Sequence, residues 1–453
     1  MATAPHPSED GARAAVASAR PPRIEAAGLH ESVGDPVLTS MTLLNEIAGR
    51  FPDAVSFAAG RPYEGFYDTR ALAGHLRTFE DYLRWEAGLT DQEVTRAFFQ
   101  YGRTKGIIHE LIARHLANDE GLRADPEDIL VTTGCQEGMV LVLRALCRDR
   151  RDVVLTSYPS YVGFLGAARL VGMPVHGVRE GATGIDVDDL TARIRRARAK
   201  GLRPRACYVV PDFANPSGAT MTTEDRRRLL EVAAQEDILL LEDNPYSMFR
   251  LAGSRPPTLK SLDRDGRVVY LGSFAKTAFA GARIGYVVAE QPVVDGSGGS
   301  TRFVDELAKL KSMLTLNTST VAQAVIGGYL LEHGCSVEKA SVREAAVYRE
   351  NLRHLLGGLT ERFGEGGADG AAGTVSWNTP NGGMFAVLSV PFRADRAMLE
   401  YSASRFGVLW TPMEHFYAGT GGQRQLRLSY SVLSPERIST GLDRLAALVR
   451  DRA

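Results

Sequence analysis

The residues best suited to catalysis lie in a short segment around Lys276. Ser273 precedes this lysine, and Arg283 follows it in a glycine-containing turn. A hydrophobic run, residues 268–272, leads directly into the segment, so we expect the lysine to lie near the end of a strand. A lysine placed there, beside a hydroxyl and an arginine, can hold an aldehyde cofactor that carries a phosphate.

Two further polar side chains follow apolar runs of the chain. Asp243 comes after residues 238–241, and Asn215 comes after residues 206–210 in a turn-forming segment. An isolated aspartate of this kind often caps a helix, and an Asn-Pro pair often only shapes a turn. The alternative is catalytic: Asp243 would keep a pyridine nitrogen protonated, so that the ring becomes an electron sink. Asn215 and Tyr246 would then bind the phenolic oxygen of that ring.

Three other features could each serve a ligand or only the fold. Gly134, Cys135 and Gln136 lie between a predicted strand and a predicted helix, where backbone N–H groups suit a phosphate or simply form a turn. Tyr161 could stack on a flat cofactor or lie in the core. Arg427 interrupts an alternating strand, so its guanidinium either meets a carboxylate on the inner face or lies exposed at an edge.

The composition is that of an ordinary globular protein. The chain has 453 residues, of which 44% are hydrophobic and 24% are charged, and its net charge is -1 at pH 7. This length favours two domains. The near-zero charge argues against nucleic acid or an anionic membrane as the main partner, and no apolar run is long enough for a membrane helix.

The cysteines and the N-terminus bear on location. Four cysteines are widely spread and form no Cys-x-x-Cys pair: Cys135, Cys147, Cys207 and Cys335. This spacing predicts neither a metal site nor a disulfide framework, and it fits a reducing cytoplasm. Residues 1–27 are rich in Ala, Pro and Ser and lack the apolar core of a signal peptide, so they are predicted to form a disordered arm.

Apolar strands alternate with helices through the middle of the chain. The predicted strands are residues 129–132, 153–155, 206–210, 238–241, 268–271 and 284–288, and the predicted helices between them are 136–147, 161–171 and 223–236. Strands that are apolar throughout belong to a parallel sheet covered on both faces, and ligands bind at the carboxyl ends of such strands. The motifs at Gly134, Asn215, Asp243 and Lys276 follow strands of this kind.

The remaining segments are predicted to complete the large domain and to form a second one. Residues 291–300 read as a surface loop; helices are predicted over 301–313, 319–331 and 336–363; a loop over 364–373; and strands over 385–390 and 425–431. We expect the N-terminal segment 29–67 to join the smaller domain. The predicted division is an arm (1–27), the N-terminal part of the small domain (28–75), the large domain (76–335) and the C-terminal part of the small domain (336–453).

Together these motifs resemble the pyridoxal-phosphate-dependent aminotransferases of fold type I, class I/II, in the branch of the kynurenine, α-aminoadipate and aromatic aminotransferases. The resemblance covers nearly the whole chain after about Gly28. Single motifs are weak, but their order and spacing are specific. The matching motifs are Tyr101-Gly102-Arg103-Thr104-Lys105-Gly106, Thr133-Gly134-Cys135-Gln136, Tyr161, Asn215-Pro216-Ser217-Gly218, Asp243-Asn244-Pro245-Tyr246, Ser273-Phe274-Ala275-Lys276 with Arg283, Gly382-Gly383-Met384-Phe385, and Arg427.

The resemblance implies an α/β fold, with a mainly parallel seven-stranded sheet in the large domain and a smaller α+β domain. It implies pyridoxal phosphate as cofactor, and a homodimer in which Tyr101 contacts the phosphate bound to the neighbouring subunit. The implied cofactor-binding residues are Gly134, Cys135, Gln136, Tyr161, Asn215, Asp243, Tyr246, Ser273, Lys276, Arg283 and Tyr101. Cys135 stands where a serine is usual. Because a thiol is the weaker donor, backbone groups, Ser273 and Arg283 would carry more of the phosphate.

The implied reaction is a ping-pong transamination between an amino acid and a 2-oxo acid. Lys276 would hold the cofactor and move the substrate α-proton, and Asp243 would keep the ring nitrogen charged. Tyr246 would hold the phenolic oxygen. Arg427 would fix the substrate α-carboxylate and orient the C–H bond that breaks. The implied substrate-binding residues are Arg427, Asn215, Gly60 and Arg61.

Two features bear on the substrate side chain. The segment that begins at residue 56 is aromatic, with Phe57, Tyr63, Phe66 and Tyr67. These rings could line a site for a large flat side chain, or they could pack inside the small domain. Arg61 and Arg103 lie in loops near the expected site, where they could bind an acidic or phenolic group or form ion pairs.

A narrower resemblance concerns arylglycine transaminases of peptide-antibiotic pathways, which act on 4-hydroxy- or 3,5-dihydroxyphenylglycine. It rests on Arg61-Pro62-Tyr63, Tyr101-Gly102-Arg103-Thr104-Lys105-Gly106-Ile107-Ile108 and Gly134-Cys135-Gln136-Glu137-Gly138-Met139. The high Arg, Ala and Gly content suits a bacterium with a GC-rich genome. We therefore predict an aromatic or arylglycine substrate in antibiotic biosynthesis.

Two other functions remain open on the sequence. The first is another pyridoxal-phosphate reaction on the same scaffold: a β-lyase, a decarboxylase, or a transaminase or oxidase for a guanidino amino acid. The second is a transcription regulator that carries an aminotransferase-like domain. Such a regulator needs an N-terminal winged helix, and the residues before Gly28 are few and weakly patterned.

Overall fold

The computed structural model describes residues 23–35, 38, 46–364 and 375–452. Most of the predicted N-terminal arm and nearly all of the predicted loop at 364–373 lie outside the described residues. Within these ranges, no helix is both long and apolar enough to cross a membrane.

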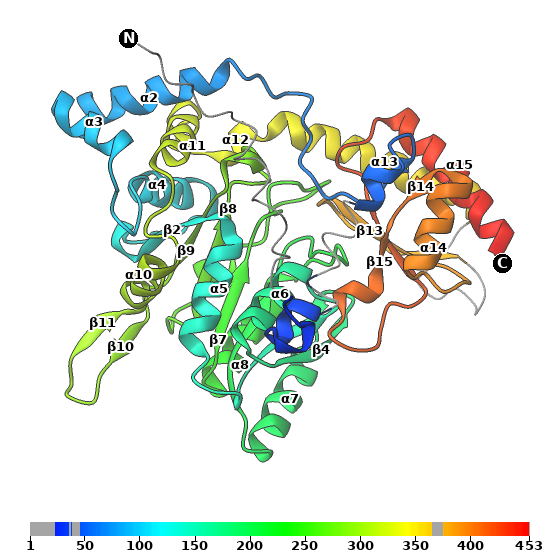
Figure 1. The fold of residues 1–453 in the computed structure, drawn as a ribbon, viewed down its shortest axis with the longest axis horizontal. Helices are drawn as coiled ribbons and strands as arrows, with labels where there is room; N and C mark the ends of the chain where they lie inside the picture. Colours follow the sequence, from blue (N-terminus) through cyan, green and yellow to red (C-terminus); the bar gives the residue numbers. More distant parts are fainter. Residues whose placement is uncertain (1–22, 36–37, 39–45, 365–374, 453) are drawn as a thin grey trace, which may run out of the picture.

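A sheet of eight strands forms the centre of the larger part of the molecule (Figure 1), in the order β2-β9-β8-β7-β6-β3-β4-β5. The strands are β2 (Ile129–Thr133), β3 (Asp152–Tyr158), β4 (Val175–Gly181), β5 (Gly184–Ile185), β6 (Arg203–Val209), β7 (Leu239–Asp243), β8 (Val268–Ser273) and β9 (Ile284–Val288). Strands β9 and β5 run antiparallel to their neighbours, and the other neighbouring pairs are parallel. The predicted mainly parallel sheet is therefore confirmed, and the short strand β5 adds an eighth to the seven expected.

Strand β4 was missed among the strands predicted one by one. Its residues are half-buried or exposed except for the buried Val178, and it carries His176, Arg179 and Glu180. It lies near the edge of the sheet, beside β3 and β5. A strand there has water on part of its surface, so it lacks the continuous apolar run that identifies the central strands.

Helices cover both faces of this sheet because successive strand residues point to opposite sides. Val269 and Leu271 of β8 pack with α5 (Gly134–Leu146), α6 (Val162–Val171) and α10 (Phe303–Leu314). Val268 and Tyr270 face the other side. The helices there are α4 (His109–Glu120), α7 (Val187–Ala199), α8 (Thr223–Gln235), α9 (Leu259–Leu262) and α11 (Thr320–Glu332), with α2 (Ala71–Trp85) and α3 (Asp91–Phe99) packed outside α11.

The smaller part contains an antiparallel sheet of four strands, in the order β12-β13-β16-β15, on the right of Figure 1. These strands are β12 (Ser376–Trp377), β13 (Phe385–Ser389), β16 (Gln425–Ser429) and β15 (Thr411–Pro412), and the helices around them are α13 (Val342–Phe363), α14 (Arg396–Tyr401) and α15 (Pro435–Arg452). Strand β1 (Val55–Ser56) pairs with β14 (Val408–Leu409), so the N-terminal segment lies against the C-terminal one.

Two predicted elements were wrong in detail. Residues 291–300, predicted as a loop, form most of an exposed hairpin of β10 (Pro292–Val294) and β11 (Ser300–Arg302). Strand-forming valines precede its turn, and the Asp295 carboxylate accepts hydrogen bonds from the backbone N–H groups of Ser297 and Gly299. The long helix predicted over 336–363 is two helices, α12 (Val337–Ala340) and α13, because the backbone leaves helical geometry at Ser341.

The direction of the strands brings distant residues to one edge of the large sheet. Strands β2, β7 and β8 end at Thr133, Asp243 and Ser273, and their carboxyl ends lie at the same edge. Arg283 immediately precedes β9, which runs the opposite way, so it also lies at that edge. This is the edge at which parallel sheets bind ligands.

Candidate active site

Two cavities share walls at this edge of the sheet. The inner cavity, of about 130 Å³, is lined by residues from the large sheet and the loops that follow its strands. The outer cavity, of about 210 Å³, is lined also by the N-terminal segment and the smaller part. Tyr161, Asn215, Tyr246 and Lys276 line both, so a ligand can extend from one into the other.

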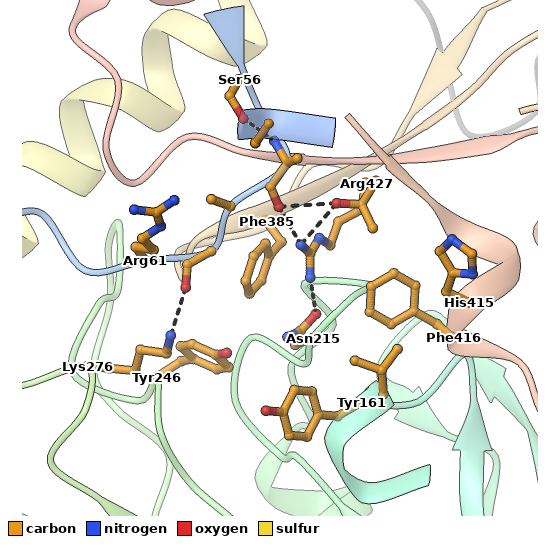
Figure 2. Close-up of a pocket in the computed structure, with 16 residues that line it drawn as sticks. Ser56, Arg61, Tyr161, Asn215, Tyr246, Lys276, Phe385, His415, Phe416 and Arg427 are labelled. Atoms are coloured by element: carbon orange, nitrogen blue, oxygen red, sulfur yellow. Dashed lines mark hydrogen bonds between the residues drawn. The ribbon is translucent and has the colours of Figure 1, made fainter. Parts of the chain in front are cut away.

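Lys276 lies at the junction of the two cavities (Figure 2). Its Nζ donates a hydrogen bond to the carbonyl oxygen of Gly60 at 2.7 Å. Burial, with the positive charges of Arg427 and Arg283, lowers the pKa of the amine to about 8. A substantial fraction of the amine is therefore neutral near physiological pH, which is the form that can act as a nucleophile or a base.

Asp243 is the last residue of β7, and its carboxylate is held by two donors. The Tyr208 hydroxyl donates to Oδ2 at 2.6 Å, and the Cys135 thiol donates to Oδ1 at 3.7 Å. Burial raises the pKa of this carboxyl to about 6, although both hydrogen bonds act to lower it. The structure therefore fixes an anion in the wall of the inner cavity, at a place that favours a positively charged partner.

The turn from β2 into α5 is shaped by its neighbours. Gly134 has a φ of 72°, and a Cβ atom at this position would clash with the guanidinium of Arg283. The Thr132 hydroxyl donates to the Gly134 carbonyl, and the Glu137 carboxylate accepts from the Thr133 N–H. These contacts fix the first turn of α5 beside Arg283. The backbone N–H groups of that turn and the Arg283 guanidinium can therefore bind the same anion.

The other residues predicted for this turn are also in place. Gln136, Ser273 and Arg283 line the inner cavity. The Gln136 amide donates to the Gly163 carbonyl at 2.8 Å, which links the turn to α6. The Cys135 side chain points at Asp243, and burial followed by the Asp243 charge raises the pKa of the thiol well above its usual value. The thiol is therefore a neutral donor to the carboxylate.

Arg427 lies in the middle of β16, between β13 and β15, and is only 7% exposed. Its Nη1 donates to Asn215 Oδ1 at 2.8 Å, and its Nη2 donates to the Ala58 carbonyl at 2.7 Å and the Thr411 hydroxyl at 3.2 Å. All of these acceptors are neutral, and the buried Nε has no hydrogen-bond partner among the described residues. The alternative of an exposed edge residue was wrong; the guanidinium is a buried cation that faces the outer cavity.

Aromatic rings enclose the ligand space. Tyr161 and Tyr246 line both cavities, and burial raises the pKa of Tyr161 to about 12 and that of Tyr246 further. The Phe385 and Phe416 rings lie 4.4 and 5.0 Å from the Arg427 guanidinium carbon. Figure 2 shows these rings around the polar groups at the centre. Neutral phenols and flat rings of this kind suit a flat ligand.

The charges in the two cavities do not balance. Lys276, Arg283 and Arg427 are cations, whereas Asp243 is the one carboxylate among the described residues that line them. Arg61 also lines the outer cavity. An excess of buried positive charge is costly unless anions bind, so the site is built for a ligand with more than one anionic group.

Two predicted site residues lie elsewhere in the subunit. Tyr101 is 81% exposed and is not among the described residues that line either cavity. Arg103 donates to the Glu127 carboxylate at 2.9 Å and also contacts His109, so for Arg103 the ion-pair alternative holds. Gly60 and Arg61 both line the outer cavity.

The aromatic residues after position 56 lie outside the two cavities of the subunit. None of Phe57, Tyr63, Phe66 and Tyr67 is among the described residues that line the cavities. Phe57 is fully buried in the core of the smaller part, Tyr63 packs edge-on against Phe66, and the Tyr67 hydroxyl donates to a backbone carbonyl. The packing alternative therefore holds for Phe57 and Tyr63, whereas Tyr67 is 46% exposed in the subunit.

The residues of the site that sequence reasoning missed include Tyr208, Thr411, His415 and Phe416. Tyr208 had a signal, because it is a hydroxyl-bearing residue in an apolar strand next to the strand that ends in Asp243. Thr411, His415 and Phe416 lie close together in a segment with no catalytic motif. Only the pairing of β15 with β16 brings that segment beside Arg427.

Comparison with known proteins gives consistent matches. The family described as aminotransferase class I and II matches residues 72–445. An (S)-3,5-dihydroxyphenylglycine transaminase from Amycolatopsis orientalis is 51% identical over 424 residues, which are 94% of each chain.

Two solved structures share the fold over nearly their whole length. The kynurenine aminotransferase of Pyrococcus horikoshii, in complex with PMP, superposes with a TM-score of 0.78 at 27% identity. The α-aminoadipate aminotransferase LysN of Thermus thermophilus, complexed with N-(5'-phosphopyridoxyl)-L-leucine, gives a TM-score of 0.75 at 27% identity. In both cases the match covers 94% of this chain and 98% of the other.

Proposed function

Because this chain belongs to the class I and II aminotransferases, we propose that it transfers the amino group between a hydroxylated arylglycine and a 2-oxo acid. The chain is an aminotransferase, and its cofactor is pyridoxal phosphate. The relatives named above are all transaminases, which favours transamination over the β-lyase, decarboxylase and oxidase alternatives.

Three features support assigning the cofactor to the inner cavity. The turn at Gly134, with Ser273 and Arg283 beside it, offers N–H groups and a guanidinium to a phosphate. Asp243 supplies a buried anion for a ring nitrogen. Lys276 supplies an amine with a lowered pKa for an aldehyde carbon. The donor set therefore fits each polar group of pyridoxal phosphate.

The proposed roles follow from the chemistry of each side chain. When bound, pyridoxal phosphate supplies an aldehyde carbon that carries the amino group and a ring that accepts electrons. Lys276 accepts the proton from the substrate α-carbon and returns it, because its lowered pKa of about 8 leaves part of the amine neutral near pH 7. Asp243 favours a protonated ring nitrogen, and Tyr246 with Asn215 holds the ring oxygen.

Arg427 is the proposed site for the substrate α-carboxylate. It presents a guanidinium to the outer cavity, and it is oriented by Asn215, Ala58 and Thr411. Gly60, on the same segment as Ala58, accepts a hydrogen bond from the Lys276 amine. The Arg427 guanidinium and the Lys276 amine thus line one cavity and contact the same segment, and this observation supports assigning carboxylate binding and proton transfer to them.

The arylglycine side chain is proposed from the similarity to the Amycolatopsis enzyme. The outer cavity supports it, since its walls include Tyr161, Tyr246, Phe385 and Phe416. The same similarity supports a role in antibiotic biosynthesis. All four cysteines are free thiols, which supports a reducing, cytoplasmic location.

We also propose a homodimer that shares its active sites. Tyr101 is exposed next to other exposed apolar side chains, namely Phe99, Met313, Leu314, Leu316 and Val321. The two segments touch, because the Thr320 hydroxyl donates to the Phe98 carbonyl. An exposed apolar patch of this kind favours a protein partner, and Tyr101 would then reach the phosphate of the neighbouring subunit.

A mixed-dimer experiment tests the shared site. The Lys276→Ala and Tyr101→Ala variants should each be inactive or strongly impaired. After the two are unfolded together and refolded, a mixed dimer contains one site with both residues intact, so activity should reappear. Each variant refolded alone is the control. Recovery that never exceeds the sum of the two controls would rule out a site shared through Tyr101.

Screening single half-reactions tests the substrate class. Amino acids are added one at a time to the holoenzyme while the absorbance of the bound cofactor is followed. We expect (S)-3,5-dihydroxyphenylglycine and 4-hydroxyphenylglycine to convert the cofactor most efficiently. If arylglycines fail while kynurenine or arginine succeeds, the arylglycine proposal is wrong, although the chain remains an aminotransferase.

A further inference from the structure

His415 is a polar residue of the outer cavity for which the reaction described above has no use. It lies in the 3-10 turn Met413–Phe416, which follows β15, and it lines the same cavity as Lys276 and Arg427. Its Nε2 is buried and has no hydrogen-bond partner among the described residues. A buried imidazole nitrogen without a partner is costly, so this position calls for a group that a ligand supplies.

The surroundings of His415 determine what that group can be. Burial lowers the pKa of the imidazole, and no charged group is among the causes of the shift. The ring is therefore neutral, with one nitrogen that donates and one that accepts a hydrogen bond. A neutral hydroxyl can likewise donate and accept a hydrogen bond, so it suits the neutral imidazole. A carboxylate would instead favour the protonated, positively charged form of the ring.

The opposite wall of the cavity has a different chemistry. In Figure 2 the His415 and Phe416 side chains lie on one side, and Arg61 and Lys276 lie on the other. Arg61 is an exposed cation, suited to an acidic group. The His415 wall is formed with Phe416 and Val162, both apolar and buried. It therefore suits an aromatic ring that carries a hydroxyl.

We propose that His415 recognises a ring hydroxyl of the substrate and thereby selects hydroxylated arylglycines over phenylglycine. This inference rests on the proposed arylglycine substrate and adds the residue that forms a hydrogen bond with the hydroxyl on its ring. Arg427 binds the carboxylate of the substrate, and His415, which lines the same cavity, contacts the ring. Phenylglycine would fill the same space but leave the imidazole unpaired.

The test compares a pair of substrates in three variants of the holoenzyme. The measured quantity is kcat/KM for (S)-3,5-dihydroxyphenylglycine divided by kcat/KM for (S)-phenylglycine. His415→Phe keeps a ring and removes the hydrogen bond, so the ratio should fall roughly 10- to 100-fold. His415→Gln keeps a donor and an acceptor at a similar reach and should retain most of the ratio. Arg61→Met changes the opposite wall of the same cavity, and it should lower the ratio less than His415→Phe does.

Binding of unreactive analogues provides a second readout. Calorimetry would compare 3,5-dihydroxyphenylacetate with phenylacetate, both of which offer Arg427 a carboxylate. We expect His415→Phe to remove the preference for the dihydroxy compound while its affinity for phenylacetate changes less. Retained cofactor absorbance and an unchanged melting temperature show that the variant is folded.

The possible failures are distinguishable. If the wild-type enzyme converts hydroxylated arylglycines but His415→Phe keeps the full ratio, the inference about His415 is wrong and the proposed function stands. The same holds if Arg61→Met, and not His415→Phe, lowers the ratio. If the wild-type enzyme converts neither arylglycine while it converts kynurenine or arginine, the proposed function and the inference both fail.

Discussion

The inner and outer cavities share four residues, yet they are built in different ways. The inner cavity is formed by the ends of β2, β7 and β8 and the loops that follow strands of one sheet. The outer cavity adds distant parts of the chain to these loops: the segment at Ala58–Arg61, and the C-terminal strands and turn that carry Phe385, His415 and Arg427. Rigid strand ends suit catalytic groups whose geometry must stay constant. A wall formed by several segments can differ between proteins that bind different substrates.

The two cavities also differ in how their polar groups are satisfied. In the inner cavity Asp243 has two donors and the turn at Gly134 is held from both sides. In the outer cavity Arg427 Nε and His415 Nε2 lack partners among the described residues. We expect the satisfied groups to position a cofactor before it binds, and the unsatisfied groups to bind the substrate. Changes in the inner cavity should therefore affect catalysis, and changes in the outer cavity should affect recognition.

The largest effect is expected at Lys276, where the cavities meet. Lys276→Ala removes the amine that we propose both to hold the cofactor and to carry the proton, so transamination should fall by at least about 10³-fold. The violet absorbance of the bound cofactor should be lost. Lys309→Ala, which removes an exposed lysine paired with Glu306, is the matched control and should stay active. Full activity in Lys276→Ala would refute the assignment of the site.

Asp243→Asn should separate activity from stability. Activity should fall by about 10²-fold or more, because the ring nitrogen loses its anion. The apoprotein should become more stable at neutral pH than the wild type. The folded-state pKa of Asp243 is raised to about 6, so its stabilising contribution is present at low pH and is lost as the pH rises through 6.

The stability advantage of Asp243→Asn should therefore grow between about pH 4 and 6 and reach at most about 3 kcal/mol. Urea unfolding of the two apoproteins at pH 5 and pH 7.5 measures it. A gap that shrinks with rising pH would mean that the carboxyl is not desolvated as described.

Arg427 provides the outer-cavity counterpart. Arg427→Leu should raise KM for the amino acid by about 10²-fold, since a charge-assisted hydrogen-bond pair to the carboxylate is lost. Cofactor affinity should change little, because Arg427 does not line the inner cavity. Arg427→Lys keeps the charge but not the planar fork of the guanidinium, so its KM should lie between that of the wild type and that of Arg427→Leu. Loss of cofactor binding in Arg427→Leu would contradict the proposal that the inner cavity binds the cofactor and the outer cavity binds the substrate.

The smallest effects are expected at the donors to Asp243. Tyr208→Phe removes a short hydrogen bond to a buried carboxylate and should weaken cofactor affinity by about 10-fold. Cys135→Ala should weaken it only a few-fold, roughly 2- to 3-fold, because a thiol is a weak donor. Equilibrium dialysis of the apoproteins against pyridoxal phosphate measures both. A larger effect for Cys135 than for Tyr208 would reverse their assigned order.

The sequence predicted the inner cavity better than the outer one. Gly134, Asn215, Asp243 and Lys276 each follow an apolar strand, and parallel strands bring such positions together whatever their distance along the chain. The predicted sheet failed only near its edge, at β4, where exposure breaks the apolar pattern. Tyr208 was missed because a single phenol in a buried strand usually indicates packing.

The outer cavity could not be read in the same way. The aromatic residues at Phe57, Tyr63 and Tyr67 were candidates for the substrate wall, and their composition alone could not separate packing from binding. His415 and Phe416 carried no signal at all, since their place beside Arg427 depends on the pairing of β15 with β16. Such pairing is a long-range contact that no local pattern encodes.

The sequence by itself determined the reaction chemistry, because the lysine, the carboxylate and the phosphate turn belong to local motifs whose geometry is fixed by the strand that precedes each one. The tertiary structure decided which side chains face the outer cavity. It buried Arg427 among neutral acceptors, turned the Cys135 thiol towards Asp243 and left His415 Nε2 without a partner among the described residues. The physical reason is that burial and partner choice depend on contacts between segments far apart in the chain, and these form only when the two parts of the molecule pack together.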